Sequence, residues 1–221
     1  MELKVIARIH NQYKTKFGIP RQSGLVRESL SAIVFEPEYR DANALRGLEE
    51  YSHLWLLWHF SENEREGWSP TVRPPRLGGN KRMGVFATRS PFRPNSIGLS
   101  CVEMDHIETG KEGPVIYVRG ADLMDETPIF DIKPYLPYVD SYPEAKAGFG
   151  GTVKEHKVEV EFLEEVKKIP SQAIKEICEI LAQDPKPGYQ KEENRIYGMT
   201  YGDYEVKFCY RDGKIVVLFI E

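Results

Sequence analysis

The chain has 221 residues, of which 41% are hydrophobic and 29% are charged, enough apolar material for one good core or for a larger domain with a small satellite. It contains no run of about 18 apolar residues and its first residues alternate as a strand, so we expect neither a transmembrane helix nor a signal peptide. The net charge of −4 argues weakly against a nucleic-acid partner, and three scattered cysteines without disulfide or zinc spacing indicate buried, reduced thiols in the cytoplasm.

Residues 1–142 carry short strand patterns and no helix of ordinary length. The strand candidates are Leu3–Ile9, Ser31–Phe35, His53–Phe60, Met83–Thr88, Ser96–Met104, Val115–Arg119 and Ile129–Ile132. The segment His53–Phe60 is almost continuously apolar and aromatic, which predicts a strand buried on both faces. Asp41 is a candidate N-cap for one short helix through Glu50. Short strands without helices between them predict a β-barrel.

A proline- and glycine-containing linker over residues 142–152 separates this region from a different pattern. After it we expect a strand over Lys157–Phe162, a helix behind a Ser171 cap, and strands over Tyr204–Tyr210 and Ile215–Ile220. Ile174, Ile177, Cys178 and Leu181 fall at helical spacing. Asp212-Gly213 between the last two strands is a strong hairpin signal.

A conventional nucleotide-binding α/β domain is not indicated. No glycine-rich turn joins a strand to a helix, and the Gly148–Gly151 cluster has no helix pattern after it, so we interpret it as a spacer. The five histidines show no metal-site spacing, and we expect no metal. The sequence therefore predicts a mainly β fold with a non-Rossmann β-barrel domain over residues 1–142 and a small α+β domain over residues 153–221.

The long irregular connection after His53–Phe60 is strongly basic. Between Gly67 and Ser100 there is no Asp or Glu, and the six basic residues are Arg73, Arg76, Lys81, Arg82, Arg89 and Arg93. This stretch carries +6, so the rest of the chain carries −10. Prolines and glycines fix the shape of such a loop, and guanidinium groups interleaved with Phe86 and Phe92 suit phosphate contact and base stacking. The alternative is a solvated loop that closes the barrel end and pairs with acids elsewhere.

The segment Asp122–Tyr135 alternates carboxylates with apolar residues around two prolines. Acids at a strand end suit a cation or the ribose hydroxyls of an adenosine. Turn-forming aspartate and proline explain much of the same pattern, so this signal does not separate the two interpretations by itself.

Several long motifs together resemble one family, and the resemblance runs nearly the length of the chain. They are Phe17-Gly-Ile-Pro-Arg-Gln22, Arg46-Gly-Leu-Glu49 with Ser52-His-Leu-Trp55, the basic connection Arg73–Leu99, Asp131-Ile-Lys-Pro-Tyr-Leu136 and Asp184-Pro-Lys-Pro-Gly-Tyr189. They are similar to the TrmO (TsaA-like) family. Two positions depart from its pattern, because Ser61-Glu62 follows Phe60 where the family commonly has a histidine, and Glu126 stands where it has a glycine.

The resemblance implies a tRNA methyltransferase that uses S-adenosyl-L-methionine (SAM) on a β-barrel and forms a homodimer. Its implied substrate is N6 of N6-threonylcarbamoyladenosine at position 37, just 3′ of the anticodon. Carried over by motif, the SAM-binding residues are Pro20, Arg21, Gln22, Ser61, Glu62, Arg89, Leu99, Asp125, Glu126, Thr127 and Pro128. The arginines available for tRNA are Arg73, Arg76, Arg82 and Arg93.

The implied acceptor nitrogen is urea-like, with a delocalised lone pair, so a carboxylate that takes its proton is the simplest catalyst. Asp125 and Asp131 are the candidates. A non-catalytic, SAM-binding regulatory module is the first alternative, and it predicts SAM affinity without turnover. A plain RNA-binding β-barrel is the second, although it does not require the Asp125–Pro128 turn beside a Pro-Arg-Gln loop.

Overall fold

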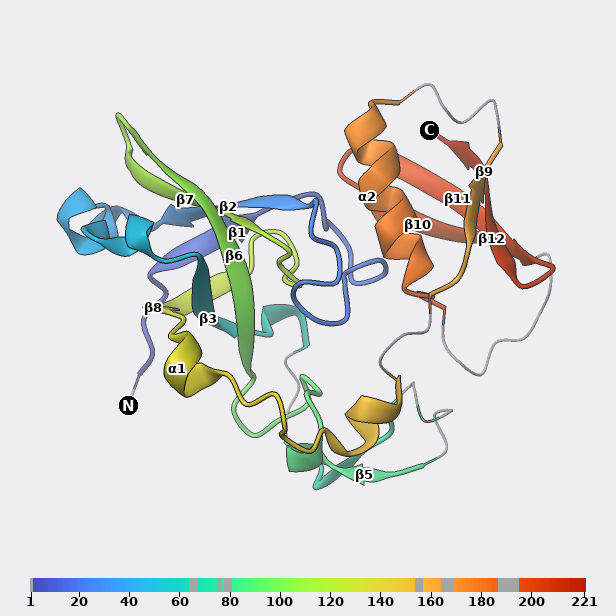
Figure 1. Ribbon diagram of the computed structural model, residues 1–221, viewed down its shortest axis with the longest axis horizontal. Coiled ribbons are helices and arrows are strands. Elements are labelled where there is room, and N and C mark those ends of the chain that lie inside the picture. The colour runs from blue at the N-terminus through green and yellow to red at the C-terminus, as the bar shows by residue number, and fades with distance from the viewer. Residues whose placement is uncertain are drawn as a thin grey trace.

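The computed structural model of the protein describes residues 2–63, 67–74, 77, 81–153, 157–163, 169–186 and 195–221. Figure 1 shows a closed β-barrel beside a smaller sheet that carries one helix. The predicted mainly β fold, with an N-terminal barrel and a C-terminal α+β unit, is confirmed. Among these residues there is no helix of the length and apolarity needed to cross a membrane. All three cysteines are free, and only Cys209 is fully buried, so the expectation of three buried thiols is wrong for the other two.

Six antiparallel strands form the barrel. In the order of their pairing they are β1 (Ala7–His10), β2 (Leu30–Phe35), β7 (Gly113–Arg119), β6 (Ile97–Gly110), β3 (His53–His59) and β8 (Pro128–Pro134), which pairs again with β1. Alternate side chains point inward, and Ile9, Ile33 and Ile116 are completely buried. Alternation of this kind is expected where one face of each strand meets the core and the other faces outward.

Strand β3 is buried on one face only, so the prediction of burial on both faces is wrong. Leu54, Leu56 and Trp58 point into the barrel, and the residues between them are half-buried. The outward apolar residues are covered locally. Trp55 lies 5.8 Å from Tyr135 between ring centres. Its Nε1 also donates a 2.9 Å hydrogen bond to Asp140 at the end of the short helix α1 (Pro137–Asp140).

The three long connections of the barrel meet at one end. Leu30 at the start of β2 pairs with Arg119 at the end of β7, and Arg8 pairs with Pro128 at the start of β8. His59 at the end of β3 pairs with Ile97 at the start of β6. Residues 11–29, 60–96 and 120–127 therefore all leave the same rim, which we call the loop end. The register of the barrel strands therefore brings these three connections together.

Six short 3-10 turns and two small strands lie in the described connections of the barrel and in the linker after it. They are the 3-10 turns η1 (Pro37–Tyr39), η2 (Ala42–Leu45), η3 (Leu48–Glu50), η4 (Ser61–Asn63), η6 (Val85–Ala87) and η7 (Gly148–Val153), with the small strands β4 (Thr71–Val72) and β5 (Met83–Gly84). Asp41 caps η2 by accepting the N–H of Asn43, but Gly47 interrupts the expected helix. The expected strand over Met83–Thr88 ends at Gly84, because Thr88 bonds back to the carbonyl of Val85 and closes a turn.

The C-terminal sheet has the order β10 (Tyr197–Tyr201), β11 (Tyr204–Arg211), β12 (Lys214–Ile220) and β9 (Val160–Phe162). Helix α2 (Ser171–Ala182) buries Ile177 and Leu181 against it. Pro170, rather than Ser171, occupies the N-cap position, so the predicted serine cap is wrong. The predicted hairpin is confirmed, with Asp212 and Gly213 both at positive φ, as a two-residue turn of this type requires.

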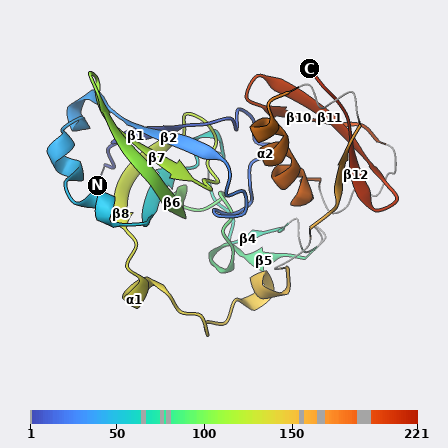
Figure 2. The ribbon, with the colours of Figure 1, turned by 45° about the horizontal axis from the view of Figure 1, so that its top comes forward.

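The connection between β1 and β2 packs into the core of the C-terminal sheet (Figure 2). Phe17 stacks on Phe208 with 6.4 Å between ring centres. Gly18 adopts φ +96, and a Cβ added there would lie 2.4 Å from the Sδ atom of Met199. The loop that carries residues 20–22 is therefore held from two sides, by the barrel and by the C-terminal sheet.

Candidate functional site

The loop end collects nearly all of the residues predicted to bind the cofactor. Pro20, Arg21 and Gln22 lie in the first connection, Ser61, Glu62 and Arg89 in the second, and Asp125–Thr127 in the third. Leu99 and Pro128 lie near the starts of β6 and β8 at the same rim. Segments separated by up to about a hundred positions in the sequence thus meet because the barrel closes.

Asp125 is fixed by three contacts to the end of β1 and the residues after it. Its Oδ1 accepts the N–H of Asn11 at 2.9 Å, and its own N–H donates to the carbonyl of Tyr13 at 2.9 Å. The ammonium group of Lys14 lies 2.6 Å from its Oδ2. The carboxylate is mostly enclosed, with 13% of the side chain exposed, so the lysine supplies the countercharge that burial demands.

Glu126 occupies the position where the family has glycine, and its backbone keeps the conformation that glycine favours. Its φ is +64, in the left-handed region, which costs a residue with a side chain about 1 kcal/mol. Two hydrogen bonds hold it there, from its N–H to Ile9 and from Arg8 to its carbonyl. The turn at Glu126 therefore has a backbone conformation that glycine also adopts.

A cavity of about 340 Å³ opens beside this turn. Its lining residues are His10, Asn11, Gln12, Lys14, Leu30, Ser31, Ala32, Tyr117, Asp125 and Glu126. His10 Nδ1 lies 3.3 Å from the carboxylate of Glu126 and 3.8 Å from that of Asp125. These three side chains could together coordinate a metal ion. The ammonium of Lys14 already neutralises Asp125, however, and the absence of a metal stays a prediction.

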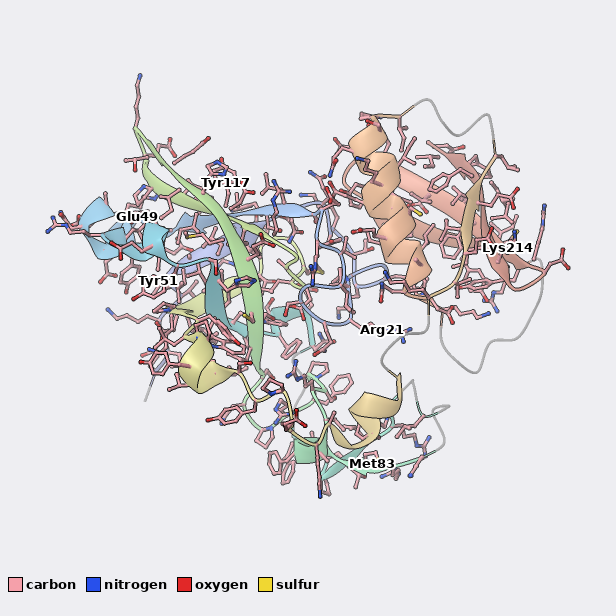
Figure 3. The ribbon with its side chains drawn as sticks, viewed as in Figure 1. Arg21, Glu49, Tyr51, Met83, Tyr117 and Lys214 are labelled. Carbon is pink, nitrogen blue, oxygen red and sulfur yellow. The ribbon has the colours of Figure 1, made fainter. Side chains whose placement is uncertain are left out.

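Gln22 and Arg89 meet across the loop end. An Arg89 guanidinium N–H donates to the side-chain carbonyl of Gln22, whose amide donates to the backbone carbonyl of Arg21. Arg21 itself is directed elsewhere. Its guanidinium donates at 2.8 Å to the carbonyl of Asp184 in the C-terminal unit, and Figure 3 shows it between the barrel and that unit. The predicted Pro-Arg-Gln motif thus contacts the barrel connection through Gln22 and the C-terminal unit through Arg21.

Asp122 is the residue that the sequence did not single out. The hydroxyl of Ser100 donates to its Oδ1 at 2.5 Å, and Trp58 Nε1 donates to that hydroxyl at 3.0 Å. Burial raises the pKa of the Asp122 carboxyl, while the hydrogen bond from Ser100 and the nearby charge of Arg89 oppose that rise. A largely buried carboxyl with a raised pKa beside predicted binding residues marks a candidate functional group.

The other predicted residues are placed less centrally. Asp131 lies within the wall of the barrel opposite Leu57, and Lys133 Nζ is 2.9 Å from its carboxylate. The carbonyl of Glu62 accepts a hydrogen bond from Lys16. Leu99 is 55% exposed, although Ser100 beside it is buried. The structure therefore brings Gln22 and Arg89 together, and it places Asp131 in the same cross-strand row as Leu99, with Leu57 between them.

The arginines predicted to contact tRNA differ in their surroundings. Arg73 is exposed, Arg82 donates to the hydroxyl of Thr71 at 2.8 Å, and Arg76 lies outside the described residues. Arg93 donates to the carbonyls of Val85 at 3.3 Å and Thr88 at 2.8 Å. Arg93 therefore stabilises the basic connection itself, and its contact with RNA stays a prediction.

Family models, related sequences and a solved structure all place the chain in the same family. The family model described as tRNA-methyltransferase O N-terminal domain matches residues 8–141, and that of the TrmO C-terminal domain matches residues 155–221. The chain is 42% identical to the tRNA (adenine(37)-N6)-methyltransferase of Escherichia coli K12, covering 100% of this chain and 97% of that protein. It is 39% identical to a putative S-adenosylmethionine-dependent methyltransferase of Pseudomonas aeruginosa, covering 93% and 90%. The crystal structure of TrmO from Pseudomonas aeruginosa superposes with a TM-score of 0.82 at 31% identity, covering 100% and 98%.

Proposed function

Because the chain belongs to the TrmO family and is a SAM-dependent tRNA methyltransferase, we propose that its acceptor is N6 of N6-threonylcarbamoyladenosine at position 37. The observation that carries this proposal is the meeting of three predicted binding segments at the loop end, one of which is strongly basic. The name of the Escherichia coli relative supports the adenine and its position. The two family-model matches also support the division into residues 1–142 and 153–221.

The residues at the loop end fit the chemistry of SAM, which supplies an electrophilic methyl group on a sulfonium. The guanidinium of Arg89 binds a carboxylate by charge-assisted hydrogen bonds, and Gln22 fixes its orientation. Leu99 offers an exposed apolar side chain to an adenine face. Thr127 and Pro128 are buried and hold the turn in place, while Pro20, Ser61 and Glu62 complete the rim.

We propose that a carboxylate at the loop end removes the proton from the acceptor nitrogen. Asp125 is the first candidate, because it lines the cavity and its backbone and side chain are both fixed. Asp131 is the second candidate, although it lies in the barrel wall and pairs with Lys133. Positioning contributes most to an in-line methyl transfer, so the rigid hydrogen bonding of Asp125 matters as much as its basicity.

The threonyl carboxylate and the RNA phosphates require cationic partners. Arg73 and Arg82 lie on the basic connection and are exposed, and Arg76 belongs to the same stretch of sequence. We further propose that the protein acts as a homodimer in the cytoplasm, which the family resemblance supports. Light scattering of the purified protein tests the dimer directly, since a single monomer mass contradicts it.

The deciding experiment is methyl transfer from labelled SAM to two preparations of one tRNA, with and without the threonylcarbamoyl group. We expect label only in the modified tRNA, at N6 of residue 37. Equal transfer to both preparations contradicts the proposed acceptor, and SAM binding without any transfer supports the non-catalytic alternative. Asp125→Asn and Asp131→Asn are compared in the same assay, and we expect the larger loss of kcat for Asp125→Asn.

A further inference from the structure

Two large aromatic side chains lie uncovered on the hairpin formed by β4 and β5. Trp68 is 53% exposed and Phe86 is 72% exposed. Their ring centres are 6.1 Å apart and the ring planes differ by 31°. Rings at this distance form a continuous apolar surface, which we call the aromatic platform. Figures 1 and 2 show the hairpin set apart from the strands of the barrel.

The platform is held by the backbone beneath it. Thr71 pairs with Gly84 and Val72 with Met83, so the two segments that carry the rings are joined by a strand ladder. The N–H of Val85 donates to the carbonyl of Pro70 at 2.9 Å, and the Val85 side chain is only 1% exposed. The buried Val85 next to Phe86, and the 2.8 Å hydrogen bond from the hydroxyl of Ser69 to the carbonyl of Thr71 next to Trp68, limit how far the rings move. The platform is therefore preorganised for a flat partner.

The charge around the platform identifies the class of that partner. The sequence from Gly67 to Ser100 contains six basic residues and no acidic residue. Arg93 lies 5.8 Å from the centre of the Phe86 ring, and Arg82 is fixed to Thr71 on the same hairpin. Two copies of so basic a segment repel each other, which disfavours an interface in which this segment meets its own copy. A polyanion with flat apolar groups, such as RNA with unpaired bases, fits both the charge and the rings.

We propose that Trp68 and Phe86 stack an unpaired nucleobase of the anticodon loop while the adenosine to be methylated is held at the loop end. This rests on the proposed function, because it assumes tRNA as the acceptor. An enzyme that modifies a base must first take that base out of its stack, at a cost of a few kcal/mol. A second base that stacks on the platform replaces part of the stacking lost in the loop. Sequence-independent stacking also explains why aromatic rings, rather than hydrogen-bonding side chains, stand at this place.

The test compares binding of an anticodon stem-loop RNA with binding of a fully paired RNA duplex of the same length. For Trp68→Ala and Phe86→Ala we expect about five- to 100-fold weaker binding of the stem-loop, and unchanged binding of the duplex and of SAM. Phe86→Tyr, which keeps an aromatic ring, should bind the stem-loop as tightly as the wild type. The matched control is Tyr138→Ala, because Tyr138 on α1 is 82% exposed but lies outside the basic connection.

Salt dependence separates stacking from charge. The slope of log Kd against log salt should stay unchanged in Trp68→Ala and should become shallower by about 0.7–0.9 in Arg82→Ala. An equal loss for stem-loop and duplex, or no loss at all, overturns the proposal. A changed mass in light scattering, or lost binding to phosphatidylserine vesicles with unchanged RNA binding, assigns the rings to another partner and also overturns it. If the wild type methylates neither tRNA preparation, the acceptor proposal fails while this binding contrast still decides on the platform.

Discussion

Replacing Asp122 by Asn should weaken SAM binding and, at neutral pH, make the folded protein more stable. Asn keeps the shape and one acceptor oxygen for the hydroxyl of Ser100, but it removes the negative charge that faces Arg89. The carboxylate acts on Arg89 through its charge, and such an electrostatic contribution to an exposed arginine is worth about 0.2–1 kcal/mol, which corresponds to as much as about fivefold in affinity. We therefore expect Asp122→Asn to raise the Kd and KM for SAM by up to that factor, because Arg89 loses a nearby opposite charge.

The same substitution should act on stability in the opposite direction. The pKa of the folded Asp122 carboxyl is raised above its ordinary value of 3.8, chiefly by burial. The stability that this group contributes is therefore fully present below pH 3.8 and is lost as the pH rises through the raised pKa. Asn resembles the protonated acid and does not titrate. At neutral pH the variant should then gain about 1.4 kcal/mol for each unit by which the pKa is raised.

Thermal unfolding between pH 4 and pH 8, measured beside SAM titrations, decides between these expectations. The melting temperatures of wild type and variant should nearly coincide at pH 4 and separate as the pH rises, by about 2–4 °C for each kcal/mol. A variant that loses stability relative to wild type as the pH rises would falsify the reasoning. Unchanged SAM binding together with the expected gain in stability would mean that Arg89 does not depend on Asp122.

Three further expectations follow from single contacts. Glu126→Gly should raise stability by up to about 0.5 kcal/mol, since relief of left-handed strain slightly exceeds the entropy cost of glycine, and a lower melting temperature would contradict this. Gly18→Ala and Gly24→Ala both place a side chain at positive φ, but only the first meets Met199, so denaturant unfolding should show it less stable by about a further 1–3 kcal/mol. Arg93→Lys should weaken tRNA binding and leave SAM binding unchanged, because the lysine side chain is one atom shorter than the path to the Nη1 atom that donates to both carbonyls; full tRNA affinity would show that these contacts do not matter.

Periodicity predicted the strands because each barrel strand buries alternate residues. The inference failed for the outward face of β3, where Trp55 contacts Asp140 of α1 and Tyr135 and the residues stay half-buried. It also failed after Gly84, where Thr88 closes a turn and ends the ladder. The first error concerns residues far away in the sequence, which the pattern of β3 does not encode. The second concerns a local side-chain hydrogen bond, which competes with the strand ladder and leaves the apolar pattern unchanged.

The candidate site shows the same limit at the level of single carboxylates. Asp122, Asp125 and Asp131 lie within one short segment and are indistinguishable by composition. The fold gives Asp125 a lysine and a backbone N–H, gives Asp131 a lysine in the barrel wall, and encloses Asp122 with a serine hydroxyl. These environments depend on β6 and on the connection after β1, whose positions follow only from barrel closure. The family motif identified the turn but not Asp122 beside it, the carboxyl whose pKa is raised by burial.

The C-terminal sheet acts on the loop end through the connection between β1 and β2. Phe17 and Gly18 pack against Phe208 and Met199, and Arg21 bonds to the carbonyl of Asp184, so the residues on both sides of Pro20 are anchored outside the barrel. A loop fixed at two points loses little further freedom when it binds a ligand, which favours affinity. The C-terminal unit therefore contributes to the proposed SAM site by limiting the motion of Gln22. For this contribution the C-terminal unit does not need to contact RNA.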